Sequence, residues 1–235
     1  MIIAHRGASE YAPENTFAAF DLAVQMGVRH IELDVHETAD GQAVVIHDNT
    51  LDRTTNGSGP VSNRSLADLK ALDAGSWFHP RFANERIPAF AEILERFGRR
   101  VHLHVEIKGG RERFCARVIE AVRAHGAERH VTITSFKAAD LVEVRRDAPD
   151  ISTGWLVREV SDEIVETARR MGVEQLCPNA RTMKADVVIR LHKEGFTVRA
   201  YGVNTDDLMR AVVLSGADGM TVNFPDKLVA HIAGE

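Results

Sequence analysis

Acidic, basic and cationic side chains gather in the first third of the chain. They stand at His5-Arg6, Glu14-Asn15, Glu32-x-Asp34 and His47-Asp48. These residue types suit the binding of one phosphate group, because carboxylates hold a cation, histidines move protons and an arginine neutralises phosphate oxygens. This clustering is the clearest indication of function in the sequence.

Glu32 and Asp34 lie in a segment that has the period of a β-strand. Polar and apolar residues alternate strictly over residues 30–36, as in a strand whose two faces differ. Both carboxylates therefore point the same way, roughly 6 to 7 Å apart at the backbone. Two adjacent carboxylates repel each other, so this spacing predicts that one cation is held between them.

A second polar strand supports the same interpretation. Residues 101–108 alternate with full regularity, and one face carries His102, His104, Glu106 and Lys108. In a closed barrel this face points toward the axis, with Glu106 and Lys108 nearest the carboxyl end, where barrel active sites lie. Glu32, Asp34 and Glu106 then supply three oxygen ligands, which suit Mg²⁺ or Ca²⁺, with Mn²⁺ as a further option, better than zinc.

The other histidines of these strands are expected to be structural. They are His30, His36, His102 and His104. Each is predicted to be a hydrogen-bonded interior imidazole, because a lone histidine on a strand is more often a satisfied core residue than a catalytic one.

The elements that position these residues follow a βα pattern. Short apolar segments predict strands at residues 2–5, 30–36, 101–108, 131–135, 153–157, 175–178, 197–201 and 219–222. Amphipathic segments predict helices at residues 16–26, 88–97, 111–124, 138–146, 161–171, 184–194 and 205–215. Eight strands alternating with helices predict one closed α/β barrel that spans residues 1–235.

Two segments interrupt this alternation. Residues 38–41 contain Asp40-Gly41 and predict a hairpin that returns His47 toward Glu32. Residues 49–87 are too long for a simple connection and contain a capping-box sequence at residues 65–68, so we predict an inserted cap subdomain there. Its aromatic residues are expected to form a small core, with contact to an incoming substrate as the alternative. They are Trp77, Phe78 and Phe82.

Composition excludes some partners. The formal charge of −5 and the pI of about 6.1 provide no basic surface for nucleic acid. No signal-like segment precedes His5 and no amphipathic anchor stands out, which predicts a cytoplasmic protein without a stable membrane anchor. Cys115 and Cys177 are expected to be free buried thiols. The oligomeric state stays open.

An ordered set of short motifs resembles the glycerophosphodiester phosphodiesterase family. The set comprises His5-Arg6-Gly7, Pro13-Glu14-Asn15-Thr16, Glu32-Leu33-Asp34-Val35, Thr38-x-Asp40-Gly41, His47-Asp48, Leu51-x-Arg53-Thr54-Thr55-x-Gly57, Ile87-Pro88 and Glu106-Ile107-Lys108. The resemblance covers the whole chain and is densest before residue 110. It implies a TIM (β/α)8 barrel with a small insertion after the second barrel strand, a divalent metal, and cleavage of glycerophosphodiesters to glycerol 3-phosphate and an alcohol.

The same resemblance implies roles for individual residues. It implies metal ligands at Glu32, Asp34 and Glu106, an acid–base pair at His5 and His47, and phosphate-binding cations at Arg6 and Lys108. Supporting residues are less determined. Glu14 is expected to brace a nearby cation, Asn15 to cap a helix or support the site, and Tyr201 to contact glycerol or to fill the barrel mouth. Gly202 replaces the polar residue that the family pattern leads us to expect.

Two other functions stay open. One is a phospholipase D-like hydrolase or lyase that acts on lysophospholipids or sphingomyelin, and the other is a metal-binding barrel without turnover. The polar insert favours small substrates such as glycerophosphocholine or glycerophosphoethanolamine, and the complete set of acids, bases and cations favours turnover. The residues do not determine which histidine is the acid, or whether a cyclic phosphate forms.

Overall fold

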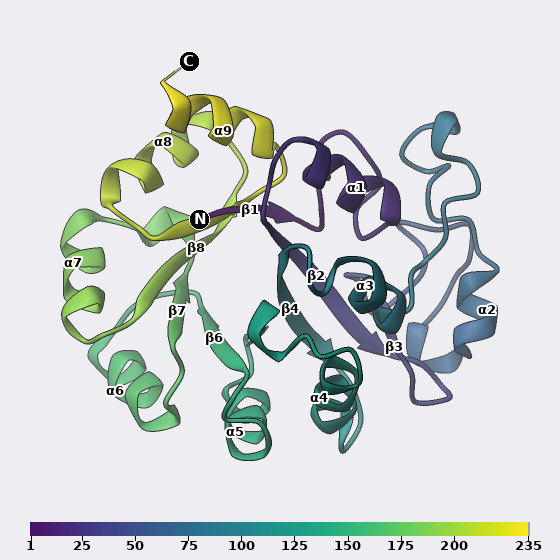
Figure 1. Cartoon of the computed structure of the whole chain (residues 1–235), viewed down its shortest axis with the longest axis horizontal. Coiled ribbons are helices and arrows are strands. Elements are labelled where there is room, and N and C mark those ends of the chain that lie inside the picture. The colour runs from purple at the N-terminus through teal and green to yellow at the C-terminus, as the bar shows by residue number, and fades with distance from the viewer. Residues whose placement is uncertain (235) are drawn as a thin grey trace.

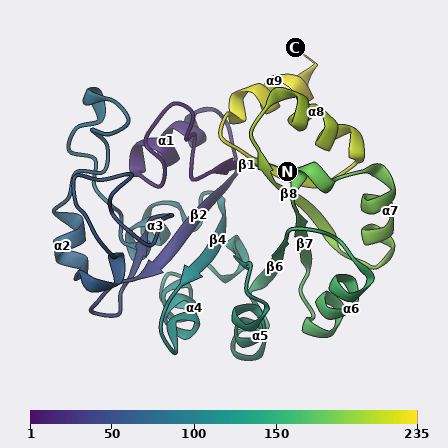
Figure 2. The same ribbon diagram turned by 180° about the vertical axis from the view of Figure 1, so that it is seen from behind.

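The computed structural model describes residues 1–234, which form a closed eight-stranded parallel barrel surrounded by helices (Figure 1; Figure 2). The barrel strands are β1 (Ile2–His5), β2 (His30–Glu37), β4 (His102–Gly109), β5 (Val131–Ser135), β6 (Ser152–Val157), β7 (Gln175–Pro178), β8 (Thr197–Val203) and β9 (Gly219–Val222). Strand β1 pairs with both β2 and β9, which closes the barrel. The predicted TIM barrel is therefore confirmed.

Helices cover the outside of this barrel (Figure 1). They are α1 (Phe17–Gln25), α3 (Phe90–Phe97), α4 (Phe114–Ala124), α5 (Ala138–Asp147), α6 (Asp162–Met171), α7 (Ala185–Lys193), α8 (Asp206–Ser215) and α9 (Pro225–Ala233). All seven predicted helices are confirmed with small differences at their ends. Helix α9 was not predicted. It begins at Pro225, whose fixed φ and missing N–H suit the first turn of a helix.

The apolar core lies between strands and helices, and the barrel interior is polar. On β2 and β4 the outward side chains Leu33, Val35, Leu103 and Val105 are fully buried beneath the helices. The intervening residues are charged or histidine and point toward the axis, because successive side chains of a strand face opposite ways. The alternation read from the sequence thus separates a packing face from a chemical face.

The predicted hairpin and insert also form. Strand β3 (Ala43–Val45) runs antiparallel to β2, with Val35 opposite Val45. The following segment contains α2 (Leu66–Lys70), which begins with a capping box between Ser65 and Asp68. It lies to one side of the barrel, near α1 and α3, in both views (Figure 1; Figure 2).

The insert's apolar core differs from the expected one. It consists of Leu51, Val61, Leu69, Ala74 and Ile87, joined to Val44 and Ile46 beside β3. The aromatic residues lie outside this core. Trp77, Phe78 and Phe82 pack edge to face with ring centroids 5.6 and 5.7 Å apart, and Trp77 is 39% exposed. Aliphatic side chains therefore supply the interior, and the aromatic residues cover its outer edge.

The fold bears on the two cysteines and on membrane association. Cys115 and Cys177 are buried and free, as predicted. Among residues 1–234, every helix is too short or too polar to cross a bilayer. The cytoplasmic location stays a prediction.

The deeper histidines are hydrogen-bonded inside the barrel, as expected. His30 Nδ1 lies 3.3 Å from His104 Nε2, and His102 Nε2 lies 2.8 Å from Thr132 Oγ1. The three rings have centroids 5.0 to 5.5 Å apart, near the amino ends of β2 and β4. His36 lies at the opposite end, where its Nε2 contacts the carbonyl of His47 at 2.9 Å.

This histidine cluster predicts a loss of stability in acid. Burial, followed by the charges of His30 and His130, lowers the pKa of His102 from 6.5 to about 4. Between these values the unfolded chain binds a proton that the folded chain excludes, so the free energy of unfolding falls as pH falls from 6.5 to 4. We expect His102→Gln to remove about 1–3 kcal/mol of this loss in urea unfolding. The exposed His231→Gln is the control, and equal acid sensitivity in both variants would contradict the prediction.

Candidate functional site

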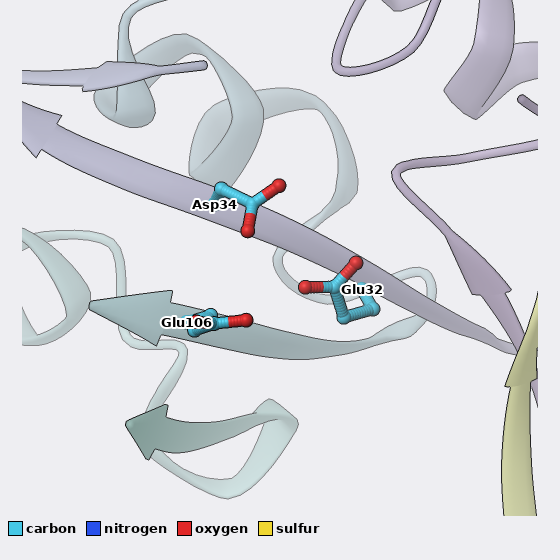
Figure 3. A group of neighbouring side chains, drawn as sticks. All are labelled: Glu32, Asp34 and Glu106. Carbon is cyan, nitrogen blue, oxygen red and sulfur yellow. The ribbon is translucent and has the colours of Figure 1, made fainter. Parts of the chain in front are cut away.

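Three carboxylates from β2 and β4 meet near the carboxyl end of the barrel. Asp34 lies directly opposite Glu106 in the strand register, and Glu32 lies two residues earlier on the same face. One oxygen from each side chain lies within 4.8 Å of the others. Figure 3 shows Asp34 and Glu32 along β2 and Glu106 on the adjacent strand. The acids predicted to converge are therefore brought together.

Burial makes this acid triad (Glu32, Asp34 and Glu106) electrostatically unfavourable by itself. Burial, then the charges of Asp34 and Glu106, raises the pKa of Glu32 well above its usual value. Burial and the charge of Asp34 likewise raise the pKa of Glu106. Asp34 Oδ1 is buried and has no hydrogen-bond partner within residues 1–234. Three oxygen donors with an unsatisfied acceptor among them fit a hard divalent cation.

Arg6 contacts the triad from the end of β1. Its Nε lies 3.3 Å from Asp34 Oδ2, and its backbone N–H donates to Glu32 Oε2 at 3.1 Å. Arg6 and Gly7 both have positive φ, 56° and 84°, which turns the chain sharply after β1. A Cβ atom on Gly7 would lie 2.6 Å from the backbone carbon of Ala19. Glycine is therefore required for this turn to pack against α1.

Lys108 contacts the triad from β4, where the strand register shifts. Val35 pairs with Ile107 but His36 pairs with Gly109, so Lys108 is the extra residue of a β-bulge. Bulges redirect side chains beside active sites. Here the Lys108 ammonium lies 2.9 Å from Glu106 Oε1 and 3.8 Å from Asp34 Oδ1.

His5 and His47 line the same pocket as Glu32, Glu106 and Lys108. His5 Nδ1 lies 2.6 Å from Asn223 Oδ1, and its Nε2 lies 3.9 Å from Glu32 Oε2. Burial and the charge of Arg6 lower the pKa of His5 to about 4, although Asn223 raises it. The Asn223 contact, which the sequence did not reveal, comes from the loop after β9 and becomes apparent only when the barrel closes.

His47 is held in a matching way. Its Nδ1 lies 2.6 Å from Asp48 Oδ1, and its Nε2 lies 3.2 Å from Lys108 Nζ. The hairpin predicted at residues 38–41 brings it to the site, as expected. For both histidines an oxygen acceptor fixes Nδ1, which leaves Nε2 toward the pocket.

A network of charges joins the insert to the barrel. Glu14 accepts hydrogen bonds from Arg6 and Arg53, each at 2.8 Å, so it braces Arg6 as expected. Arg53 also donates to Asp48 at 2.7 Å. Arg53 therefore anchors the insert and links Glu14, which contacts Arg6, to Asp48, which contacts His47.

Asn15 supports the site and is not a helix cap. Its side-chain amide donates to Asp34 Oδ2 at 2.9 Å, and its φ of 57° is left-handed. The cap of α1 is Thr16, which has extended backbone and accepts from the amide of Ala19. The capping alternative for Asn15 is therefore wrong, because the turn that places it beside Asp34 excludes cap geometry.

Tyr201 lies at the rim of the pocket. Its ring packs edge to face against Phe136, with centroids 5.2 Å apart. Gly202 follows at a φ of 76°, where the register between β8 and β9 shifts. A left-handed residue in a bulge favours glycine, which accounts for the missing polar residue.

Arg199 is a further residue of the pocket lining that sequence reasoning missed. It lies two residues before Tyr201 on β8 and therefore shares its inward face. The alternation of residues 197–201 contained this signal.

Electrostatic repulsion within the triad predicts that removing one of its charges raises the free energy of unfolding. An acid whose pKa is raised on folding weakens the folded state when it is ionised at neutral pH. We therefore expect Glu32→Gln, which keeps an acceptor for the Arg6 amide, to raise the free energy of unfolding of metal-free protein by about 1–3 kcal/mol. Chemical denaturation in the presence of a chelator measures this change. The exposed Glu10→Gln is the control, and a destabilised Glu32→Gln would contradict the expectation.

Comparison with protein families identifies one match along almost the entire chain. A sequence profile described as the glycerophosphoryl diester phosphodiesterase family matches residues 5–227. A glycerophosphodiester phosphodiesterase of Caldanaerobacter subterraneus is 37% identical over 233 residues, which cover 97% of this chain and 96% of the relative.

Solved structures agree with this match. A phosphodiesterase of Oleispira antarctica, in complex with the product sn-glycerol-3-phosphate, has a TM-score of 0.92 at 30% identity and covers 98% of this chain and 96% of its own. A glycerophosphodiester phosphodiesterase of Agrobacterium tumefaciens has a TM-score of 0.85 at 33% identity, with coverage of 97% and 98%.

Proposed function

This chain belongs to the glycerophosphoryl diester phosphodiesterase family and is a phosphoric diester hydrolase, and we propose that it cleaves small water-soluble glycerophosphodiesters to glycerol 3-phosphate and an alcohol. Glycerophosphocholine and glycerophosphoethanolamine are the substrates we propose. The proposal is carried by one observation: Glu32 and Glu106 line one pocket with two histidines, and an oxygen of Asp34 lies within 4.8 Å of an oxygen of each of these acids. The product bound to the Oleispira relative supports the identity of the phosphate product.

Glu32, Asp34 and Glu106 would hold one divalent cation, Mg²⁺ or Ca²⁺, with Mn²⁺ also compatible. Their mutual spacing within 4.8 Å and the unsatisfied Asp34 Oδ1 support this assignment. When bound, the cation supplies positive charge to a non-bridging phosphate oxygen. The carboxylates gain in turn, because the cation relieves their repulsion.

Arg6 and Lys108 bind the phosphate in this proposal. A phosphodiester carries one negative charge that repels nucleophiles, and more charge develops on its oxygens in the transition state. Cations fixed in advance stabilise that charge without reorganising. The contacts of both side chains with the triad keep them at the pocket and limit their freedom before substrate arrives.

His5 and His47 transfer the protons. The Lys108 ammonium can only donate a hydrogen bond, so its contact with His47 Nε2 favours an unprotonated nitrogen there. This suits His47 as a group that accepts a proton, and the lowered pKa of His5 leaves its Nε2 unprotonated near neutral pH as well, so we propose the two imidazoles as an acid–base pair without dividing the roles. Both the acid and the base are needed in either mechanism, whether water attacks the phosphorus directly or the glycerol 2-hydroxyl attacks it first.

Glu14, Asn15 and Tyr201 complete the site as supporting residues. Glu14 orients Arg6, and Asn15 orients Asp34. Tyr201 and Phe136 provide an apolar rim suited to the carbon skeleton of glycerol.

A substrate panel with metal removal tests the activity. Enzyme-coupled detection of glycerol 3-phosphate should give turnover on glycerophosphocholine and glycerophosphoethanolamine, loss of turnover with EDTA, and recovery with Mg²⁺, Ca²⁺ or Mn²⁺. Lysophosphatidylcholine should react far more slowly. Preferential cleavage of the lysolipid would instead favour the phospholipase D-like function, and full activity in EDTA would refute the metal requirement.

Two variants separate metal binding from proton transfer. His47→Ala should lower kcat by about 10²- to 10⁴-fold and leave calorimetric metal binding nearly unchanged. Glu32→Gln should lose both, since it removes a ligand charge. His231→Ala, on the exposed face of α9, is the control for activity. Equal loss of metal binding in both site variants would show that the roles are not separate.

A further inference from the structure

Arg199 is an unusual residue of the barrel interior. Its side chain is 1% exposed and is the largest of the fully buried side chains. It lines the same pocket as Glu32 and Glu106. A guanidinium group is always charged and is rarely buried without a carboxylate partner, so its position calls for a physical reason.

The direct contacts of Arg199 do not balance its charge. Its Nε donates to Cys177 Sγ at 3.4 Å, which is a weak, neutral acceptor. Its Nη1 is buried and has no hydrogen-bond partner within residues 1–234. Burying a charge without an opposite charge nearby costs several kcal/mol, so compensation must come through space from the acids that share the pocket.

The surroundings allow this long-range compensation. Arg199 lies opposite Gly219 in the strand register, so the residue paired with it on β9 carries no charge of its own. Arg199, Glu32 and Glu106 are all buried and line one pocket, where water screens the interaction of the guanidinium charge with the acids poorly. Its charge therefore acts on the triad without a direct ion pair.

Arg199 differs from the other cations of the site in its burial and in its contacts. Arg6 and Lys108 form ion pairs with the triad and line the open pocket, where an incoming phosphate would compete for them. Arg199 lines the same pocket but is only 1% exposed, so a bound phosphate has much less access to it. The three carboxylates thus lie near three cations, of which Arg199 is the least exposed.

We propose that Arg199 is a positioning residue, a fixed counter-charge inside the barrel that stabilises the acid triad before the divalent cation binds and moderates the affinity for that cation. The inference rests on the proposed metal site. A positive charge near the triad reduces repulsion among the acids, and it also repels an incoming cation. Removing the charge should therefore change the two properties in opposite directions.

The test measures both properties in Arg199→Met and Arg199→Lys. In chelator-treated protein, Arg199→Met should lower the thermal midpoint by roughly 5 °C, because the acids lose their counter-charge. At mildly alkaline pH, where protons compete least with the cation, calorimetry should show Mg²⁺ and Ca²⁺ bound roughly three- to thirtyfold more tightly. Arg199→Lys, which keeps the charge, should leave both values near those of the wild type.

A merely structural role would lower stability without tightening metal binding. Unchanged or weaker cation affinity in a folded Arg199→Met therefore overturns the inference, as does greater stability of that variant in chelator. Cys177→Ser is the control for the lost Nε contact and should leave cation affinity unchanged. If Arg199→Met does not fold, the double variant Arg199→Met/Glu106→Gln should fold, because it restores the charge balance, and failure of both overturns the inference.

The outcomes also separate this inference from the proposed function. If the wild-type protein binds neither Mg²⁺ nor Ca²⁺ in calorimetry, the proposed metal site fails. If the wild type binds a cation and Arg199→Met binds it equally well, only the role of Arg199 fails.

Discussion

Mutual repulsion among three buried carboxylates is the constraint on which the arrangement at the carboxyl end of this barrel depends. The oxygens of Glu32, Asp34 and Glu106 lie within 4.8 Å of one another in a region where water screens them poorly. Each neighbouring element compensates for this repulsion: Arg6 follows β1, β4 bulges at Lys108, and the turn before α1 places Asn15 beside Asp34. The positions of Arg6, Lys108 and Asn15 in the site are therefore explained by their contacts with these acids.

The barrel accommodates such a site because its two sides are chemically different. Aliphatic side chains pack beneath the helices and supply the burial that stabilises the fold. The interior can then carry histidines, carboxylates and an arginine that contribute little to packing. Strict alternation along β2 and β4 makes this division possible, since each residue of a strand serves only one of the two sides.

The sequence alone predicted the features that depend on the alternation of polar and apolar residues along a strand and on short turns. Alternation alone placed Glu32, Asp34 and Glu106 on inward faces, and a short turn at residues 38–41 returned His47 to them. It missed what depends on neighbouring strands. The bulge at Lys108 is a property of two registers, the partner of His5 comes from the last loop of the closed barrel, and Asn15 adopts a backbone conformation that its residue type alone does not reveal.

The double contact of Arg53 gives the insert a part in the reaction centre. Arg53 contacts both Glu14 and Asp48, so one side chain of the insert supports the residues that hold Arg6 and His47 in place. The insert is therefore structurally connected to residues that line or support the pocket. A chimaera that replaces this segment with an unrelated insert would therefore keep Glu14 and Asp48 joined only if it retained an arginine at the position of Arg53.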